Sequence, residues 1–227
     1  LFKRQKSNRT TIHRTTEETK LQNKMKVSVF PLRHILLWLM SMALLPANAQ
    51  RLVMPAALRA GDTIAIVSPS STPDTLTVEK GCQTLREWGY VPVVAPHALN
   101  SWHGFAGTAD ERAADMLWAL RDSTVKAIIC SRGGDGAVQV LRRIPLSEFR
   151  SHPKWVMGFS DATALHSAEV AAGVMSIHCS MCDGISMRGE RDSVNAILQR
   201  LLQGEMPSYQ APAHQLNQYG EAEGILV

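Results

Sequence analysis

Short apolar runs alternate with amphipathic segments of helical length from residue 62 onward. The runs expected to be strands are 63–67, 91–94, 127–130, 155–157 and 175–178, and the expected helices are 74–88, 110–120, 162–172 and 193–202. Strands that alternate with helices are typical of βαβ units and a parallel sheet. The pattern therefore predicts an α/β fold of the Rossmann-like or flavodoxin-like kind, with an open, mostly parallel sheet flanked by helices. Ligands of such sheets usually lie beyond the carboxyl ends of the strands.

The first 49 residues lie outside this alternation of strands and helices. Residues 1–24 have no apolar periodicity and are expected to be a disordered extension upstream of a start at Met25. Residues 25–49 have a basic beginning, an apolar stretch too short to span a bilayer and an A-x-A cleavage site, which predicts a signal peptide and export to the periplasm. An uncleaved membrane anchor, and a basic arm at 1–24 that binds nucleic acid or membrane, are the competing interpretations.

The rest of the chain is expected to form one domain and the beginning of another. Residues 50–204 contain the βαβ pattern, and 205–221 are polar and irregular, which is typical of a linker. Residues 222–227 open a new apolar strand. Because a single strand cannot satisfy its own backbone, we expect it to be the first strand of a truncated second domain.

The net charge of +4 is concentrated outside the expected domain. Residues 1–49 hold nine basic and two acidic side chains, so the chain from residue 50 onward has 15 basic and 18 acidic ones. A mildly acidic domain gives no reason to expect a nucleic-acid partner. At 45% hydrophobic and 19% charged residues, the composition excludes a disordered protein.

Two junctions between a strand and a helix are the candidate sites of chemistry. Residues 131–137 (SRGGDGA) follow one strand with three glycines, which let backbone N–H groups approach an anion closely. Residues 158–162 (GFSDA) follow the next strand and place Ser160 at a tight turn before a helix, as in a nucleophile elbow. The pattern alone also fits an ordinary helix cap at the second junction and a dinucleotide loop without the usual glycine spacing at the first.

Together these motifs resemble the LD-carboxypeptidase family of serine peptidases, which is peptidase family S66 and includes the murein tetrapeptide carboxypeptidases. The motifs that carry the resemblance are RAGDTIAIVSPS at 59–70, FAGT at 105–108, DER at 110–112, RGG at 132–134 and GFSDATAL at 158–165. The resemblance implies a Ser-His-Glu hydrolase that removes the terminal D-alanine from peptidoglycan tetrapeptides.

The resemblance also implies roles for individual residues. Ser160 matches the nucleophile, and the N–H groups of Asp161 and Gly134 match the oxyanion hole. Arg132 and Gly133 match the substrate-binding side of the glycine turn. A murein peptide is the expected partner, no cofactor or metal is expected, and a homodimer of the full-length protein is left open.

Two features depart from the family pattern. Asp135 stands where an aromatic residue is usual, and the family's catalytic Glu and His are expected beyond residue 227, so we expect this chain alone to be inactive. His166 and His178 are expected to be structural rather than the catalytic base. A non-catalytic module that binds wall peptides, and a related amide hydrolase acting on peptide-nucleotide conjugates or recycled muropeptides, are the alternative functions.

The four cysteines give weaker signals. Cys82 and Cys130 lie in apolar surroundings and are expected to be buried free thiols. Cys179 and Cys182 form a single CxxC pair, which without a second pair is weak evidence for a metal or redox site.

Overall fold

The computed structural model describes residues 52–188, 192–210, 212–218 and 220–221. The extension at 1–24, the signal peptide at 25–49 and the strand at 222–227 lie outside these ranges, so they stay predictions. Within the described residues, no helix has the length and apolar character needed to cross a membrane. The described residues between 205 and 221 form neither helix nor strand.

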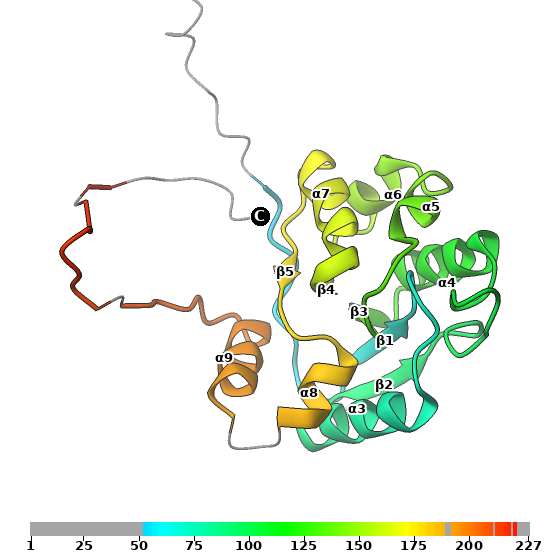
Figure 1. Ribbon diagram of the computed structural model, residues 1–227, viewed down its shortest axis with the longest axis horizontal. Helices are drawn as coiled ribbons and strands as arrows, with labels where there is room; N and C mark the ends of the chain where they lie inside the picture. Colours follow the sequence, from blue (N-terminus) through cyan, green and yellow to red (C-terminus); the bar gives the residue numbers. More distant parts are fainter. Residues whose placement is uncertain (1–51, 189–191, 211, 219, 222–227) are drawn as a thin grey trace, which may run out of the picture. The chain divides into compact units, whose positions relative to one another are not determined.

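A five-stranded sheet forms the centre of the domain (Figure 1), and all of its neighbouring strands are parallel. The strands lie in the order β2-β1-β3-β4-β5. Their bounds are β1 (Thr63–Val67), β2 (Val91–Val94), β3 (Val125–Cys130), β4 (Trp155–Gly158) and β5 (Ile177–His178). The predicted α/β fold with an open parallel sheet is therefore confirmed, and the strand order is the flavodoxin-like one.

Helices cover both faces of the sheet, and each face has its own apolar core. On one face lie α3 (Thr75–Glu87), α8 (Cys182–Arg188) and α9 (Ser193–Leu202), and on the other lie α4 (Ala109–Arg121), α5 (Ala137–Leu141), α6 (Leu146–Ser151) and α7 (Thr163–Ala171). Alternate residues of each strand enter opposite cores: Ile64 and Ile66 pack on one side of β1, and Ala65 and Val67 on the other. β1, β3 and β4 are buried on both faces, and such a strand has a continuous apolar run, which is why the sequence showed these three clearly.

The structure adds three helices to the expected ones. α5, α6 and α8 have only five, six and seven residues, too few to show a helical period in the sequence. Leu76 in the first turn of α3 is 56% exposed and is not part of the core. The buried positions of α3 are Val78, Gly81, Cys82 and Leu85, which follow the i, i+3, i+4, i+7 spacing of one helical face.

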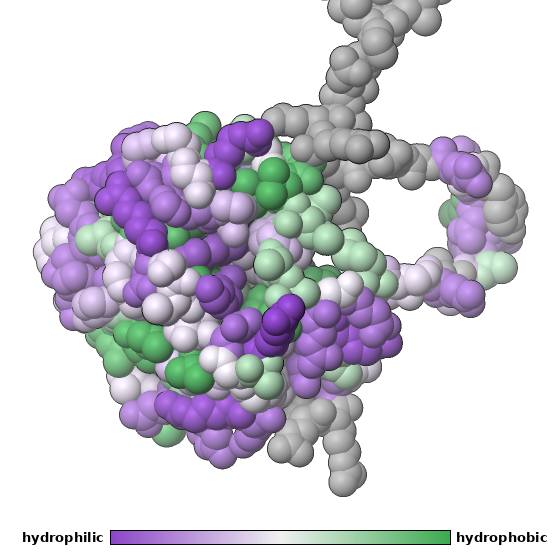
Figure 2. All heavy atoms as spheres, turned by 180° about the vertical axis from the view of Figure 1, so that it is seen from behind, coloured by the Kyte–Doolittle hydropathy of each residue, from purple (hydrophilic) through white to green (hydrophobic). Residues whose placement is uncertain are grey.

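Apolar side chains also reach the surface of the domain. Seen from behind, the surface is largely hydrophilic, with groups of apolar side chains set among the polar ones (Figure 2). The exposed apolar side chains include Trp102, Phe159 and Met187. Of these, Phe159 lies immediately before Ser160, so apolar surface is available next to the candidate site.

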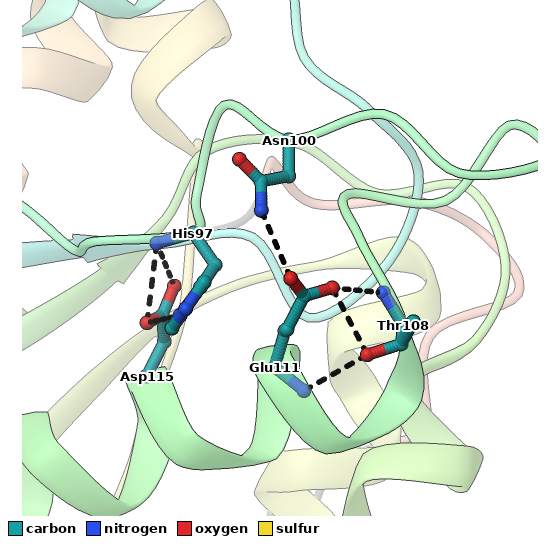
Figure 3. A network of polar contacts seen from close by, with 5 residues as sticks. All are labelled: His97, Asn100, Thr108, Glu111 and Asp115. Atoms are coloured by element: carbon teal, nitrogen blue, oxygen red, sulfur yellow. Dashed lines mark hydrogen bonds and ion pairs between the residues drawn. The ribbon is translucent and has the colours of Figure 1, made fainter.

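The connection from β2 to α4 is held at both ends by side chains of α4 (Figure 3). The backbone N–H of His97 donates to both carboxylate oxygens of Asp115, at 3.0 and 3.3 Å, and its Nδ1 lies 2.8 Å from the same carboxylate. At the other end, Thr108 and Glu111 form a capping box, and Asn100 donates to the Glu111 carboxylate at 3.2 Å. Burial raises the pKa of Asp115, so these donors compensate a carboxylate that water does not reach.

We expect Asp115→Ala to lower the free energy of unfolding by about 2–3 kcal/mol, because it leaves the donors of His97 unpaired next to the core. The matched control is Asp110→Ala on the same helix, where the carboxylate is 81% exposed and pairs only with Arg143 at the surface. This control is expected to cost less than about 1 kcal/mol. Urea unfolding measures both, and equal losses would show that the β2–α4 connection does not depend on Asp115.

Candidate active site

Three loops meet where β1, β3 and β4 end. These strands are neighbours and run parallel, so their carboxyl ends lie at the same edge of the sheet. The loop after β1 begins at Ser68 and the loop after β3 at Ser131, and the hydroxyl oxygens of these two buried serines are joined by a hydrogen bond of 2.7 Å. Helix α4 comes from the β2 side and contacts the same loops through Arg112. Residues distant in sequence are thus brought to one edge.

Ser160 occupies a strained turn at the end of β4. Its φ is +60°, in the left-handed region that non-glycine residues rarely adopt, and its side chain is exposed. The chain enters the turn through Gly158, where an added Cβ would lie 2.9 Å from the Cβ of Ala162. It leaves through the 3₁₀ turn η1 (Ser160–Ala162), which continues directly into α7. This is the strand-turn-helix geometry of a nucleophile elbow.

The cap function that the sequence pattern also allowed is absent. A serine cap has extended backbone angles and accepts a hydrogen bond from the first turn of the helix. Ser160 has a left-handed φ, and neither η1 nor α7 has a hydrogen bond from a capping side chain. The strain at Ser160 therefore has no explanation in helix capping.

The glycine turn after β3 lies against Ser160. An added Cβ at Gly133 would lie 3.1 Å from both Cβ and Oγ of Ser160. Gly134 has φ +127°, and an added Cβ would lie 2.1 Å from the Oγ of Ser71. Position 134 therefore requires glycine, and a side chain at Gly133 would crowd Ser160. The N–H of Gly134 has no acceptor within the part of the chain that the structure describes, so it can donate to a ligand.

The carboxylate of Asp161 joins the three loops. Its Oδ2 accepts a hydrogen bond of 2.6 Å from the hydroxyl of Ser70, after β1, and one of 2.9 Å from the backbone N–H of Ala137, at the start of α5. The sequence suggested only the amide of Asp161 as a functional group. It gave no signal for the carboxylate, because Ser70 lies 91 positions away.

A buried arginine of α4 holds two of these loops by hydrogen bonds to their backbone carbonyls. Arg112 is only 2% exposed, and its Nη1 donates to the carbonyls of Pro69 at 2.5 Å and Gly136 at 3.1 Å. Its Nη2 donates to the side chain of Gln139 at 2.7 Å, and its guanidinium stacks over the ring of Phe105 at 4.8 Å. Burial lowers the pKa of Arg112, and the carbonyl acceptors compensate the buried cation. In the sequence, this arginine was part of a motif without an assigned role.

The other candidate residues are exposed or have structural contacts. Arg132 and Asp135 are exposed, and Arg132 has no hydrogen bond or ion pair within the described residues. His166 is buried, with Nε2 2.9 Å from the carbonyl oxygen of Gly158, whereas His178 is exposed at the end of β5. Among the described residues, neither histidine is hydrogen-bonded to Ser160.

The cysteines offer no reactive group. All four are free thiols, and Cys82 and Cys130 are buried as the sequence predicted. Burial raises the pKa of Cys179 and of Cys182 to about 12, so both stay protonated near neutral pH and are poor nucleophiles and metal ligands. In the described ranges, no group of three or more His, Cys, Asp or Glu side chains is placed to hold a metal ion.

The described domain belongs to the class of open parallel α/β sheets, and its strained serine turn lies beside a double-glycine turn at the carboxyl ends of the strands. The particular family is identified by comparison. The family model described as the LD-carboxypeptidase N-terminal domain matches residues 64–179, which shows that the chain belongs to peptidase family S66.

Several named relatives of the chain are described as carboxypeptidases. It is 35% identical over 178 residues to a probable murein peptide carboxypeptidase of Bacillus subtilis, covering 76% of this chain and 56% of the relative. It is 39% identical over 141 residues to a putative carboxypeptidase of Streptomyces coelicolor, covering 60% and 46%. A murein tetrapeptide carboxypeptidase of Pseudomonas aeruginosa is 27% identical, with 72% and 56% covered. The matched part thus spans about half the length of these relatives.

Solved structures show the same fold. An MccF-like protein from Bacillus anthracis superposes with a TM-score of 0.62 at 25% identity, covering 66% of this chain and 47% of that one. The microcin C7 self immunity protein in its apo state superposes with a TM-score of 0.63 at 21% identity, covering 70% and 50%.

We expect Asp161→Ala to lower the free energy of unfolding by about 2–3 kcal/mol, because the hydroxyl of Ser70 and the N–H of Ala137 lose a charged acceptor. Asp135→Ala in the neighbouring turn is the matched control, since Asp135 is exposed, and it is expected to stay within about 0.5 kcal/mol of the parent. Chemical unfolding compares the two variants. An Asp161→Ala protein as stable as the control would show that the carboxylate does not hold the three loops together.

The strain at Ser160 predicts an inverted ranking of glycine and alanine. Ser160→Gly is expected to be about 1 kcal/mol more stable than Ser160→Ala, because glycine has no Cβ penalty at positive φ. At Ser167, which is exposed in α7, the order is expected to reverse by about the same amount, since glycine is a poor helix former. Thermal unfolding of the four variants measures both differences in stability. If alanine is more stable than glycine at both positions, the turn at Ser160 is not strained.

Proposed function

We propose that the protein carries the nucleophile of a serine-type LD-carboxypeptidase that removes the terminal D-alanine from murein tetrapeptides. The observation that carries the proposal is the exposed Ser160, held at φ +60° with Gly133 directly against its side chain. The family membership and the murein peptide carboxypeptidases among its relatives support the reaction class and the substrate.

In the proposed reaction, Ser160 Oγ attacks the carbonyl carbon of the peptide bond before D-alanine. The developing oxyanion accepts hydrogen bonds from the N–H groups of Asp161 and Gly134, which are fixed before the substrate arrives. The C–N bond breaks, D-alanine leaves as an amine after gaining a proton, and the acyl group stays on Ser160. Water then hydrolyses the ester and restores the hydroxyl. Gly133 leaves room for the substrate beside Ser160, and we assign Arg132 to the substrate side of the turn.

The proposed reaction requires a base that the described residues do not place at Ser160. No histidine or glutamate in the described part of the chain is hydrogen-bonded to the hydroxyl of Ser160. We place the catalytic Glu and His in the part of the relatives' length that this chain does not span. Loss of the base in a serine hydrolase lowers kcat on the order of 10⁶-fold, so we expect the 227-residue chain alone to be inactive.

Export fits this substrate. The expected signal peptide at 25–49 would bring the domain to the compartment that holds murein, so we propose a periplasmic location. A second amide substrate, a peptide joined to a nucleotide, is kept as an alternative. The microcin C7 self-immunity protein of Escherichia coli is 29% identical over 117 residues, and a structure of such a protein contains aspartyl sulfamoyl adenosine. That match covers 34% of the relative, less than the match to the murein enzymes.

The test uses the protein extended to the length of its relatives. D-alanine release from tetrapeptide is expected for the parent and to fall on the order of 10⁶-fold in Ser160→Ala, without loss of the folded state by circular dichroism. Ser167→Ala, which changes an exposed serine of α7, is the control and is expected to keep full turnover.

Each alternative gives a different result in the same assay. Retained turnover in Ser160→Ala would place the nucleophile elsewhere. Tight binding of tetrapeptide by calorimetry without hydrolysis by the parent would indicate a recognition module. Preferential cleavage of a peptidyl-nucleotide amide would change the substrate and keep the nucleophile.

A further inference from the structure

A buried pair of ionisable side chains lies on α7, the helix into which the Ser160 turn leads. His166 is 5% exposed and Glu169 is 1% exposed, and Nδ1 of the histidine lies 3.9 Å from Oε2 of the glutamate. Within the described residues, both of these atoms are buried without a hydrogen-bond partner. The proposed reaction uses neither side chain, so we considered a structural function for the buried pair.

The contact of His166 with Gly158 fixes which ring nitrogen carries hydrogen. Nε2 lies 2.9 Å from the carbonyl oxygen of Gly158, and a carbonyl only accepts, so Nε2 must donate. Burial lowers the pKa of His166, which keeps the ring neutral. A neutral imidazole has one N–H, so Nδ1 is an acceptor that needs a donor.

Glu169 can supply that donor only in its protonated form. An ionised carboxylate accepts hydrogen bonds but donates none, whereas a protonated one has an O–H. Burial raises the pKa of Glu169 well above its ordinary value, which favours the protonated carboxyl group. The separation of 3.9 Å is longer than a hydrogen bond, so the contact requires the carboxyl group to turn toward Nδ1 or one water to bridge the two atoms.

The carbonyl at the end of this chain of contacts belongs to the residue that opens the strained turn. Gly158 is the last residue of β4, two positions before Ser160, and its carbonyl also accepts a hydrogen bond of 2.9 Å from the N–H of Cys179. A residue at φ +60° keeps that conformation only if the peptides around it are fixed. Two donors on one carbonyl provide such a fixed point.

We propose that Glu169 and His166 are positioning residues: a neutral relay from the Glu169 O–H through the imidazole to the Gly158 carbonyl holds Ser160 in its attacking conformation. This rests on the proposed function only in taking Ser160 as the nucleophile. Neither residue touches the substrate, and the relay transfers no net proton. It acts through the backbone of β4.

Few other titratable groups face the pair. His178 of β5 has its ring centroid 5.9 Å from that of His166, and Cys130 of β3 interacts electrostatically with Glu169. Burial raises the pKa of Glu169 more strongly than the neighbouring Ser176 side chain lowers it. Of these side chains, only His178 can become positively charged, and its ring lies beside that of His166.

The relay predicts a pH-dependent difference in stability between the parent chain and Glu169→Gln. In the unfolded state Glu169 ionises above a pH of about 4.3, whereas in the folded state it stays protonated. Rising pH therefore favours unfolding of the parent until it passes the folded pKa, and the ratio of its unfolding constant to that of Glu169→Gln is expected to grow by up to about tenfold per pH unit. Because both proteins keep His166, its titration cancels.

Chemical unfolding of the 227-residue chain between pH 5 and 8 measures this ratio. Glu205→Gln, which changes an exposed glutamate, is the control and is expected to show a constant ratio to the parent. Nitrogen-15 chemical shifts of His166 are expected to report the Nε2–H tautomer throughout the range. A constant ratio for Glu169→Gln, or an Nδ1–H tautomer, would overturn the relay.

Turnover in the extended protein separates positioning from simple support of the fold. His166→Gln keeps an N–H donor for the Gly158 carbonyl and is expected to retain most of the parent kcat, whereas His166→Leu is expected to lose about tenfold or more in kcat with KM nearly unchanged. Equal kcat values for the two variants would overturn the proposal. Should His166→Leu fail to fold, Glu169→Leu against Glu169→Gln makes the same comparison. If Ser160→Ala is active, the proposed function is wrong. The unfolding and NMR measurements would still show whether Glu169, His166 and the Gly158 carbonyl form the relay.

Discussion

The geometry of the candidate site depends on the carboxylate of Asp161. Its two hydrogen bonds, from Ser70 and from the backbone of Ala137, tie the loops after β1 and β3 to the turn after β4. The parallel sheet brings these three loops to one edge, but their relative positions within that edge are set by side chains. Asp161 therefore has two functions. Its carboxylate holds the loops together, and its backbone N–H is a donor of the proposed oxyanion hole.

The remaining features make this assembly compatible with a strained serine. Gly133 lets the backbone come close to Ser160, which a side chain there would crowd, and Gly134 lies where an added Cβ would collide with Ser71. Arg112 supports the loops on the core side, with the carbonyls of Pro69 and Gly136 as its acceptors. A serine in the left-handed conformation costs about 1–2 kcal/mol. Such strain persists at a functional position because the neighbouring loops hold the residue in place.

The sequence predicted the parts of the fold that have a local signal. β1 and β2 have the predicted bounds because each is an apolar run bordered by turn residues, and the Ser160 elbow was visible because strand, turn and helix follow one another directly. α5, α6 and α8 were missed because they are shorter than two helical turns. The carboxylate function of Asp161, the support by Arg112 and the contact between His166 and Gly158 had no signal, because each depends on a distance that only the folded chain sets.

The measurement that tests the central claim most directly is labelling of the extended protein with a fluorophosphonate, a reagent that phosphonylates activated serine hydroxyls. Peptide mass mapping locates the adduct while residual D-alanine release is followed in the same samples. We expect turnover to fall in proportion to the fraction of Ser160 that carries the phosphonyl group. Full turnover by protein labelled at Ser160, or loss of turnover with the label on another residue, would contradict the assignment of Ser160 as the nucleophile.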